Sequence, residues 1–158
     1  MNTLKTFLYM GFMHGFFTFY FPYQLASRDV FVFNTNILSY LAIPFFLIGT
    51  IIIIWCSVDM VKKGLGTPAH VDPPKKLIIN GLYHYVRNPI YLGALLVLLG
   101  YILWFGSGLM VIYFFLFLLA YQILITLIEE PVLRNMFGKG YEEYCQKVPR
   151  WIPRIVWR

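Results

Sequence analysis

Charged residues are scarce in this chain. Asp, Glu, Lys and Arg make up 13% of its 158 residues, whereas soluble domains usually carry about a quarter. No charged residue falls in 6–27, 30–58 or 88–128. Because uncharged apolar runs of 18 or more residues are typical of membrane spans, these runs exclude an ordinary soluble domain.

The third run is about twice as long as one membrane-crossing helix requires. We therefore expect it to fold as a helical hairpin that turns at Gly106-Ser107-Gly108. The predicted fold is an all-α polytopic membrane protein, a single membrane domain over 1–158. Its parts are four spans near 6–25, 37–58, 89–105 and 109–128, a linker over 59–88 and a tail over 129–158.

Cysteine and histidine are also few. The two cysteines, Cys56 and Cys145, form no C-x-x-C pair, and the three histidines are scattered, so we predict neither a disulfide nor a metal site. We expect His14, inside the first apolar run, to be a packed polar residue rather than a ligand.

The basic residues that are present lie on one side of the predicted membrane. If the N-terminus is cytoplasmic, four spans place twelve of the thirteen Lys and Arg residues inside, and only Arg28 outside. We therefore predict an integral membrane protein with cytoplasmic N- and C-termini, in the inner or plasma membrane if it is bacterial. The run after Lys5 has no A-x-A-like site, so we expect a retained helix rather than a signal peptide. The net charge of +6 fits a face against anionic lipid and predicts no nucleic-acid partner.

The tail has an amphipathic helical period. Its apolar residues recur at three- and four-residue spacing and are broken by Gly138 and Gly140, which predicts two short helices. The pattern supports two interpretations about equally: helices that rest on lipid headgroups, or a lid over a cavity between the spans.

Glu129-Glu130-Pro131 ends the predicted fourth span, where adjacent carboxylates are costly to bury. Pro131 predicts a kink or a restart of the helix. Arg87 and Glu129 lie 20 and 22 residues from Ser107, so the hairpin brings the stretch GLYHYVRNPIY beside EEP and predicts an Arg–carboxylate pair. This arrangement suits a polar cofactor that meets an apolar substrate.

These stretches resemble a known family. GLYHYVRNPIY is similar to the G-x-Y-x-x-x-R-H-P-x-Y signature of the isoprenylcysteine carboxyl methyltransferases. EEPVLRNMFGKGYEEYCQKVPRWIP is similar to their second signature, E-E-x-x-L-x-x-x-F-G-x-x-Y-x-x-Y-x-x-x-V-x-R-x-x-P. The resemblance covers 81–153 and extends to the wider superfamily that includes phospholipid methyltransferases. One departure is Asn88, which stands where the family has histidine and cannot titrate near neutrality; His84 is the candidate substitute.

The resemblance implies an integral-membrane methyltransferase that uses S-adenosylmethionine on a lipid-like or prenylated substrate, such as the carboxylate of an isoprenylcysteine. Arg87 and Glu130 are the expected catalytic residues. The expected cofactor-binding residues are Tyr83, His84, Val86, Asn88, Pro89, Tyr91, Glu129, Glu130, Tyr141 and Tyr144. The alternatives are a membrane reductase using NADPH and a non-catalytic membrane adaptor. The actual methyl acceptor and the oligomeric state stay open.

Overall fold

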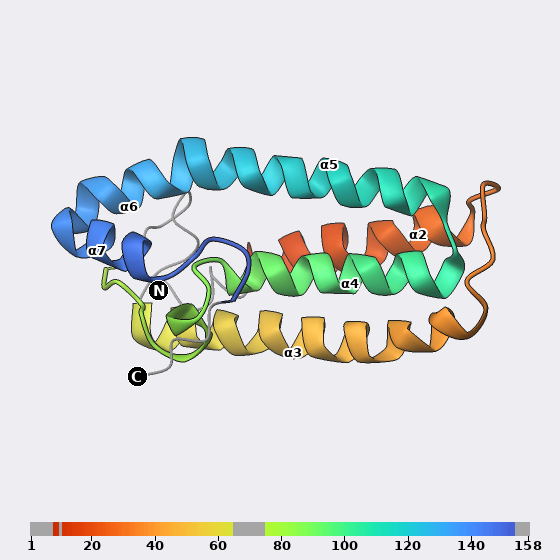
Figure 1. Cartoon of the computed structure of the whole chain (residues 1–158), viewed down its shortest axis with the longest axis horizontal. Coiled ribbons are helices and arrows are strands. Elements are labelled where there is room, and N and C mark those ends of the chain that lie inside the picture. The colour runs from red at the N-terminus through yellow and green to blue at the C-terminus, as the bar shows by residue number, and fades with distance from the viewer. Residues whose placement is uncertain (1–7, 10, 65–74, 154–158) are drawn as a thin grey trace.

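The computed structural model describes residues 8–9, 11–64 and 75–153, most of which are helical (Figure 1). The first helix is described at 8–9 and 11–27; it contains a π-helical turn, η1 (Gly15–Tyr20), and ends in α2 (Phe21–Ser27). The elements after it are η2 (Asn36–Leu41), α3 (Ala42–Asp59), η3 (Met60–Gly64), η4 (Gly81–His84), α4 (Pro89–Phe105), α5 (Gly108–Leu124), η5 (Ile125–Glu129), α6 (Glu130–Phe137) and α7 (Lys139–Lys147). Only an isolated bridge, between Val32 and Ser107, represents β-structure among these residues.

Helix α4 forms the centre of the bundle. It packs against α3, α5 and the first helix (Figure 1). Its side chains Ala94, Val97 and Leu98 have no exposed surface, and they form the core together with residues from α3 and α5. By contrast, the outer faces of α3 and α5 carry exposed apolar side chains such as Ile54, Trp55 and Phe115. Exposed apolar surface of this extent fits contact with lipid.

Two glycines allow α3 and α4 to approach closely. A Cβ atom added to Gly49 would lie 2.6 Å from the carbonyl oxygen of Gly93, and one added to Gly93 would lie 2.8 Å from that of Gly49. Gly100 makes similar room for the ring of Phe46. Small residues at helix contacts are typical of membrane proteins, where close backbone packing replaces the hydrophobic effect.

The predicted turn between α4 and α5 is confirmed. Gly106 ends α4 in the left-handed region, at φ 61°, and Ser107 caps α5 by accepting a hydrogen bond from Met110 N–H. The Asp29 carboxylate accepts hydrogen bonds from Ser107 Oγ at 2.6 Å and from Leu109 N–H at 2.8 Å. Burial alone would raise the pKa of Asp29, but these hydrogen bonds outweigh it and lower that pKa.

The helix of the fourth predicted span continues into the tail without a break. Pro131 cannot donate a backbone hydrogen bond, and the chain accommodates it through η5, where Glu130 N–H donates to Ile125 O five residues earlier. The helix then continues as α6. The two predicted tail helices are present as α6 and α7, which are separated at Gly138 alone; Gly140 lies within α7.

The all-helical prediction is confirmed for the described residues. Two helical stretches, Asn36–Lys62 and Gly108–Phe137, are long and apolar enough to cross a membrane, and α4 is apolar but only 17 residues long. These helices are consistent with a membrane protein, while the count of four spans remains a prediction. The first predicted span begins among residues outside the described ones.

Candidate functional site

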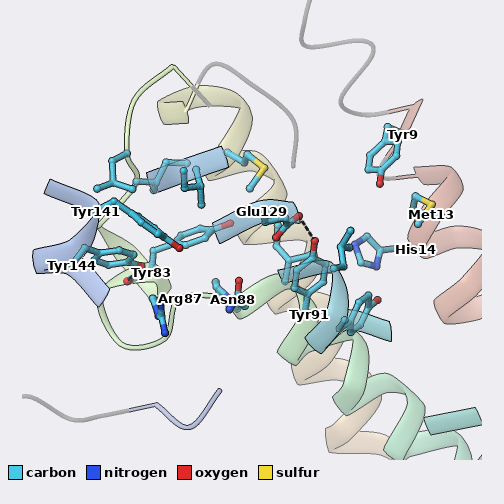
Figure 2. Close-up of a pocket in the computed structure, with 18 of the residues that line it drawn as sticks. Tyr9, Met13, His14, Tyr83, Arg87, Asn88, Tyr91, Glu129, Tyr141 and Tyr144 are labelled. Atoms are coloured by element: carbon cyan, nitrogen blue, oxygen red, sulfur yellow. Dashed lines mark hydrogen bonds between the residues drawn. The ribbon is translucent and has the colours of Figure 1, made fainter. Parts of the chain in front are cut away.

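Helix α7, η4 and the start of α4 meet at one end of the bundle (Figure 1), and a cavity lies among them (Figure 2). Its volume is about 110 Å³, well above the roughly 10–15 Å³ that holds one water molecule. Segments far apart in the sequence line it: the first helix, the stretch 77–91, the second half of α5, Glu129 and α7. Figure 2 shows Tyr83, Tyr141, Tyr144 and Arg87 on one side, Tyr9, Met13 and His14 on the other, and Glu129 with Tyr91 between them.

The middle of the cavity is set by the hairpin. Pro89 begins α4, and its fixed φ suits the first position of a helix. Tyr91 therefore lies in the first turn of α4, opposite the end of α5. Its hydroxyl donates to Glu129 Oε1 at 2.5 Å, and its ring stacks on Tyr121 with centroids 4.3 Å apart. The Glu129 carboxylate is thus fixed at the cavity wall, and the side chain is 7% exposed.

Glu130 has different surroundings. Its carboxylate accepts hydrogen bonds from Arg87 at 3.1 Å and Arg150 at 2.9 Å, and Arg134 lies 3.9 Å away. The predicted Arg–carboxylate pair is therefore present. This ion cluster lines a separate open groove together with Cys145, whose sulfur accepts a hydrogen bond from Arg87 at 2.7 Å. Arg87 borders both the cavity and the groove, whereas Glu130 borders only the groove.

Tyr83, Tyr141 and Tyr144, which we call the tyrosine end, close the other side of the cavity. Tyr141 and Tyr144 come from α7, and both are buried. The Tyr144 hydroxyl donates to Tyr83 O at 2.6 Å, and Arg87 N–H donates to Pro149 O at 2.9 Å, so the tail is joined to the stretch before α4. These contacts favour the lid reading of the tail over helices that only rest on lipid.

Two buried polar atoms at this end have no hydrogen-bond partner among the described residues: Tyr83 Oη and Arg87 Nε. Such atoms are costly unless something binds them. Burial raises the pKa of the Tyr83, Tyr141 and Tyr144 hydroxyls, so each stays a neutral hydrogen-bond donor at physiological pH. Free donors, aromatic faces and the Glu129 carboxylate are a set that fits a ligand with an aromatic base, hydroxyls and an ammonium group.

The structure brings most of the predicted site residues together, and it separates three of them from the cavity. Those that line it are Tyr83, Arg87, Asn88, Pro89, Tyr91, Glu129, Tyr141 and Tyr144. His84 is exposed, with its ring edge-on to Tyr85. Val86 is buried behind the wall, and Glu130 lies in the ion cluster. Asn88 donates to Arg150 O at 3.3 Å, so its amide also ties the tail to α4.

Sequence reasoning missed the residues that the first helix and α5 contribute. Tyr9, Met13 and His14 line the cavity opposite the tyrosine end, with Phe117, Tyr121 and Leu124 of α5 nearby. The predicted packing of His14 is present, since Nδ1 contacts Thr18 Oγ1 at 3.2 Å, but the ring also faces the cavity (Figure 2). The only available signal was a histidine in an uncharged run. No cluster of His, Cys, Asp and Glu among the described residues could hold a metal ion.

The chain is similar to known methyltransferases. A model of the phospholipid methyltransferase family matches residues 37–140. A protein-S-isoprenylcysteine O-methyltransferase of Schizosaccharomyces pombe is 31% identical over 140 residues, which cover 85% of this chain and 56% of that protein. A probable protein-S-isoprenylcysteine O-methyltransferase of Oryza sativa subsp. japonica is 36% identical over 86 residues, 54% of this chain and 45% of that protein.

A third relative is shorter. An uncharacterized protein of Haemophilus influenzae is 38% identical over 63 residues, 40% of this chain and 100% of that protein. The chain spans about half the length of the two methyltransferases it matches. No solved structure matches the chain.

Proposed function

The chain belongs to the phospholipid methyltransferase family, and we propose that it is a methyltransferase that uses S-adenosylmethionine to methylate a lipid-like or hydrophobic substrate. The carboxylate of an isoprenylcysteine is the first candidate acceptor, since two of the relatives are named for that reaction. The family and the long apolar helices indicate an integral membrane protein. The observation that carries the proposal is the cavity. Aromatic residues and the Glu129 carboxylate line it, and Tyr83 and Arg87 each have a buried donor atom without a partner among the described residues.

Each wall of the cavity suits one part of this cofactor. The carboxylate of Glu129, held by the Tyr91 hydroxyl, attracts an ammonium group. The Tyr83 hydroxyl is free to bind a polar group of the ligand. The rings of Tyr141 and Tyr144 offer aromatic faces for adenine or for a sulfonium ion. When bound, S-adenosylmethionine supplies a methyl group on a positively charged sulfur, which is a good leaving group.

The protein's own contribution to such a transfer is mainly position and exclusion of water. A carboxylate acceptor is already a nucleophile, so the residues must align it with the methyl carbon at about 3–3.5 Å rather than remove a proton. The α7 lid, joined to Tyr83 by the Tyr144 hydroxyl, covers the tyrosine end and shields it from water. Arg87, on the border between cavity and groove, offers a guanidinium to a carboxylate on either side.

Calorimetric titration of the purified protein in detergent with S-adenosylmethionine and S-adenosylhomocysteine, with NADPH in parallel, tests the proposal. Tyr83→Phe should weaken S-adenosylhomocysteine binding about three- to tenfold, the effect of one hydrogen bond, without lowering the melting temperature. Glu129→Gln should weaken it more than tenfold because a charge-assisted contact is lost. Phe12→Leu, whose side chain is 63% exposed on the first helix, serves as the control.

Each outcome leads to a different class of protein. Binding of S-adenosylmethionine and S-adenosylhomocysteine, weakened in Tyr83→Phe and Glu129→Gln but not in Phe12→Leu, supports the methyltransferase. Binding of NADPH alone would move the proposal to a reductase. A folded protein that binds none of the three would contradict an enzymatic role and direct attention to an adaptor.

A further inference from the structure

The first helix contributes none of the residues that we assign to the cofactor, yet it lines one side of the cavity. Tyr9, Met13 and His14 line the side opposite the tyrosine end (Figure 2); we call these three residues the first-helix end. The region matched by the family model begins at residue 37, so this helix lies outside it.

His14 is the polar group at this end that has a free hydrogen-bonding position. Its ring is 7% exposed, and Nδ1 contacts Thr18 Oγ1 at 3.2 Å. Thr18 itself is fully buried, which fixes the orientation of the ring. Nε2 makes no hydrogen bond to the described residues and so remains available to a ligand. If the Thr18 hydroxyl donates to Nδ1, Nε2 carries the hydrogen and donates to an oxygen of that ligand.

The surroundings of His14 are apolar and reach the surface of the bundle. Met13 of the first helix and Phe117 and Leu124 of α5 all line the cavity, and all three are only half-buried. After His14, hydrogen bonds join the first helix to α5 and α4: Tyr113 Oη donates to Phe17 O at 2.8 Å, and Tyr101 Oη donates to Phe19 O at 3.1 Å. This part of the cavity is lined by Tyr9, Met13, His14 and the second half of α5. Its apolar side chains are only partly covered, which suits an apolar chain that extends toward lipid.

We propose that the first-helix end holds the methyl acceptor, an amphiphile whose apolar chain lies between Met13, Phe117 and Leu124 and whose polar head is hydrogen-bonded by His14 Nε2. This inference rests on the proposed function and names the substrate class of the same cavity. It divides the cavity into a cofactor side, with Tyr83, and an acceptor side, with His14; Glu129 and Tyr91 lie between the two (Figure 2). His14 is a positioning residue here, because it orients the head group and takes no part in bond making.

Two variants of the first helix separate this role from folding. The probe is S-farnesylcysteine, a prenyl thioether with a free carboxylate, titrated into the purified protein with and without S-adenosylhomocysteine. His14→Leu should weaken probe binding about tenfold, because the head group loses a hydrogen bond in an apolar site. His14→Gln, which keeps a donor, should stay within about threefold of the wild type. S-adenosylhomocysteine affinity should change less than twofold in both variants.

A second pair of variants tests the path of the chain. Met13→Trp should weaken probe binding by filling part of the cavity with a larger side chain, and Phe12→Leu, on the exposed face of the same helix, should not. Where turnover is measurable, His14→Leu should raise the KM for the acceptor and leave the KM for S-adenosylmethionine unchanged. A purely structural role for His14 would instead lower the melting temperature and both affinities together.

The outcomes keep this inference apart from the proposed function. A folded His14→Leu that binds the probe as the wild type does would overturn the role of His14. A wild type that binds S-adenosylhomocysteine but not the probe would overturn the substrate class. Binding of the probe that depends on His14, in a protein that does not bind the cofactor pair, would leave the amphiphile site in place and contradict the methyltransferase.

Discussion

At the scale of single residues, the two adjacent glutamates, Glu129 and Glu130, have different surroundings. Successive helical residues point about 100° apart, so Glu129 turns to the cavity and Glu130 turns to the arginines. Glu129 accepts a hydrogen bond from the neutral Tyr91 hydroxyl, whereas Glu130 lies between the guanidinium groups of Arg87 and Arg150. We therefore propose different tasks for these two identical side chains: ligand binding for Glu129, and attachment of the tail for Glu130.

Glu130→Ala should destabilise the protein rather than act on the cofactor alone. Removing the carboxylate leaves Arg87, whose side chain is 13% exposed, and Arg150, 26% exposed, without their shared partner. We expect a loss of about 2–3 kcal/mol, less than for a fully buried pair because Arg150 is partly solvated. Thermal or denaturant unfolding in detergent measures it.

Glu129→Gln is the matched comparison. It should change the melting temperature little and S-adenosylhomocysteine affinity strongly, because Gln keeps the shape of the side chain and loses its charge. The reverse pattern, a stable Glu130→Ala with lost affinity beside a Glu129→Gln that binds normally, would exchange the two roles.

At the scale of elements, the contact between α3 and α4 supports the site. α4 begins at Pro89 in the cavity wall, and Gly93, one turn later, lies against Gly49 of α3. The nearest atom to an added Cβ at each glycine is a backbone carbonyl oxygen, which cannot move aside as the end of a side chain could. The position of Tyr91 therefore depends on how closely these two helices pack.

Gly49→Ala should push α3 away from α4 and lower stability by about 1–3 kcal/mol, the usual effect of overpacking. Gly140→Ala is the control, because a Cβ there meets nothing within 4 Å and Ala favours the helix by up to about 1 kcal/mol. The melting temperature and the affinity for S-adenosylhomocysteine should both fall in Gly49→Ala and should not fall in Gly140→Ala. If Gly49→Ala unfolds at the wild-type temperature, the close contact does not contribute to stability.

At the scale of the whole molecule, the two ends of the bundle differ in charge. Arg87, Arg134 and Arg150 gather at the end with the cavity, whereas Arg28 follows α2 at the opposite end (Figure 1). Because basic residues favour the cytoplasmic side, we propose that the cavity end faces the cytoplasm. A cofactor made in the cytoplasm would then reach the site from the aqueous side.

Single cysteines introduced in a variant with Cys56 and Cys145 replaced by serine test this orientation. In sealed cells, an impermeant maleimide should label a cysteine at Arg28 and should not label one at Gln146 until the membrane is opened. Labelling at Gln146 in sealed cells, with protection at Arg28, would reverse the topology.

Much of this arrangement follows from the sequence. The uncharged runs determine the helices, and Gly106-Ser107-Gly108 determines where the long run turns. Because Arg87 and Glu129 are nearly equidistant from that turn, the helical rise alone places the two signatures at one depth. A pair between Arg87 and one of the two glutamates, and the division of the tail into two helices, could therefore be predicted without coordinates.

The facing of individual side chains was decided only by the tertiary structure. α5 is apolar on all sides, so its sequence carries no period that marks an inner face. The π-helical turn η5 adds a residue before Pro131 and shifts the register, which settles that Glu129 rather than Glu130 meets the cavity. His14 is a second example. The sequence shows only a polar residue in an apolar run, and the packing of the first helix against α4 and α5 places it at the cavity.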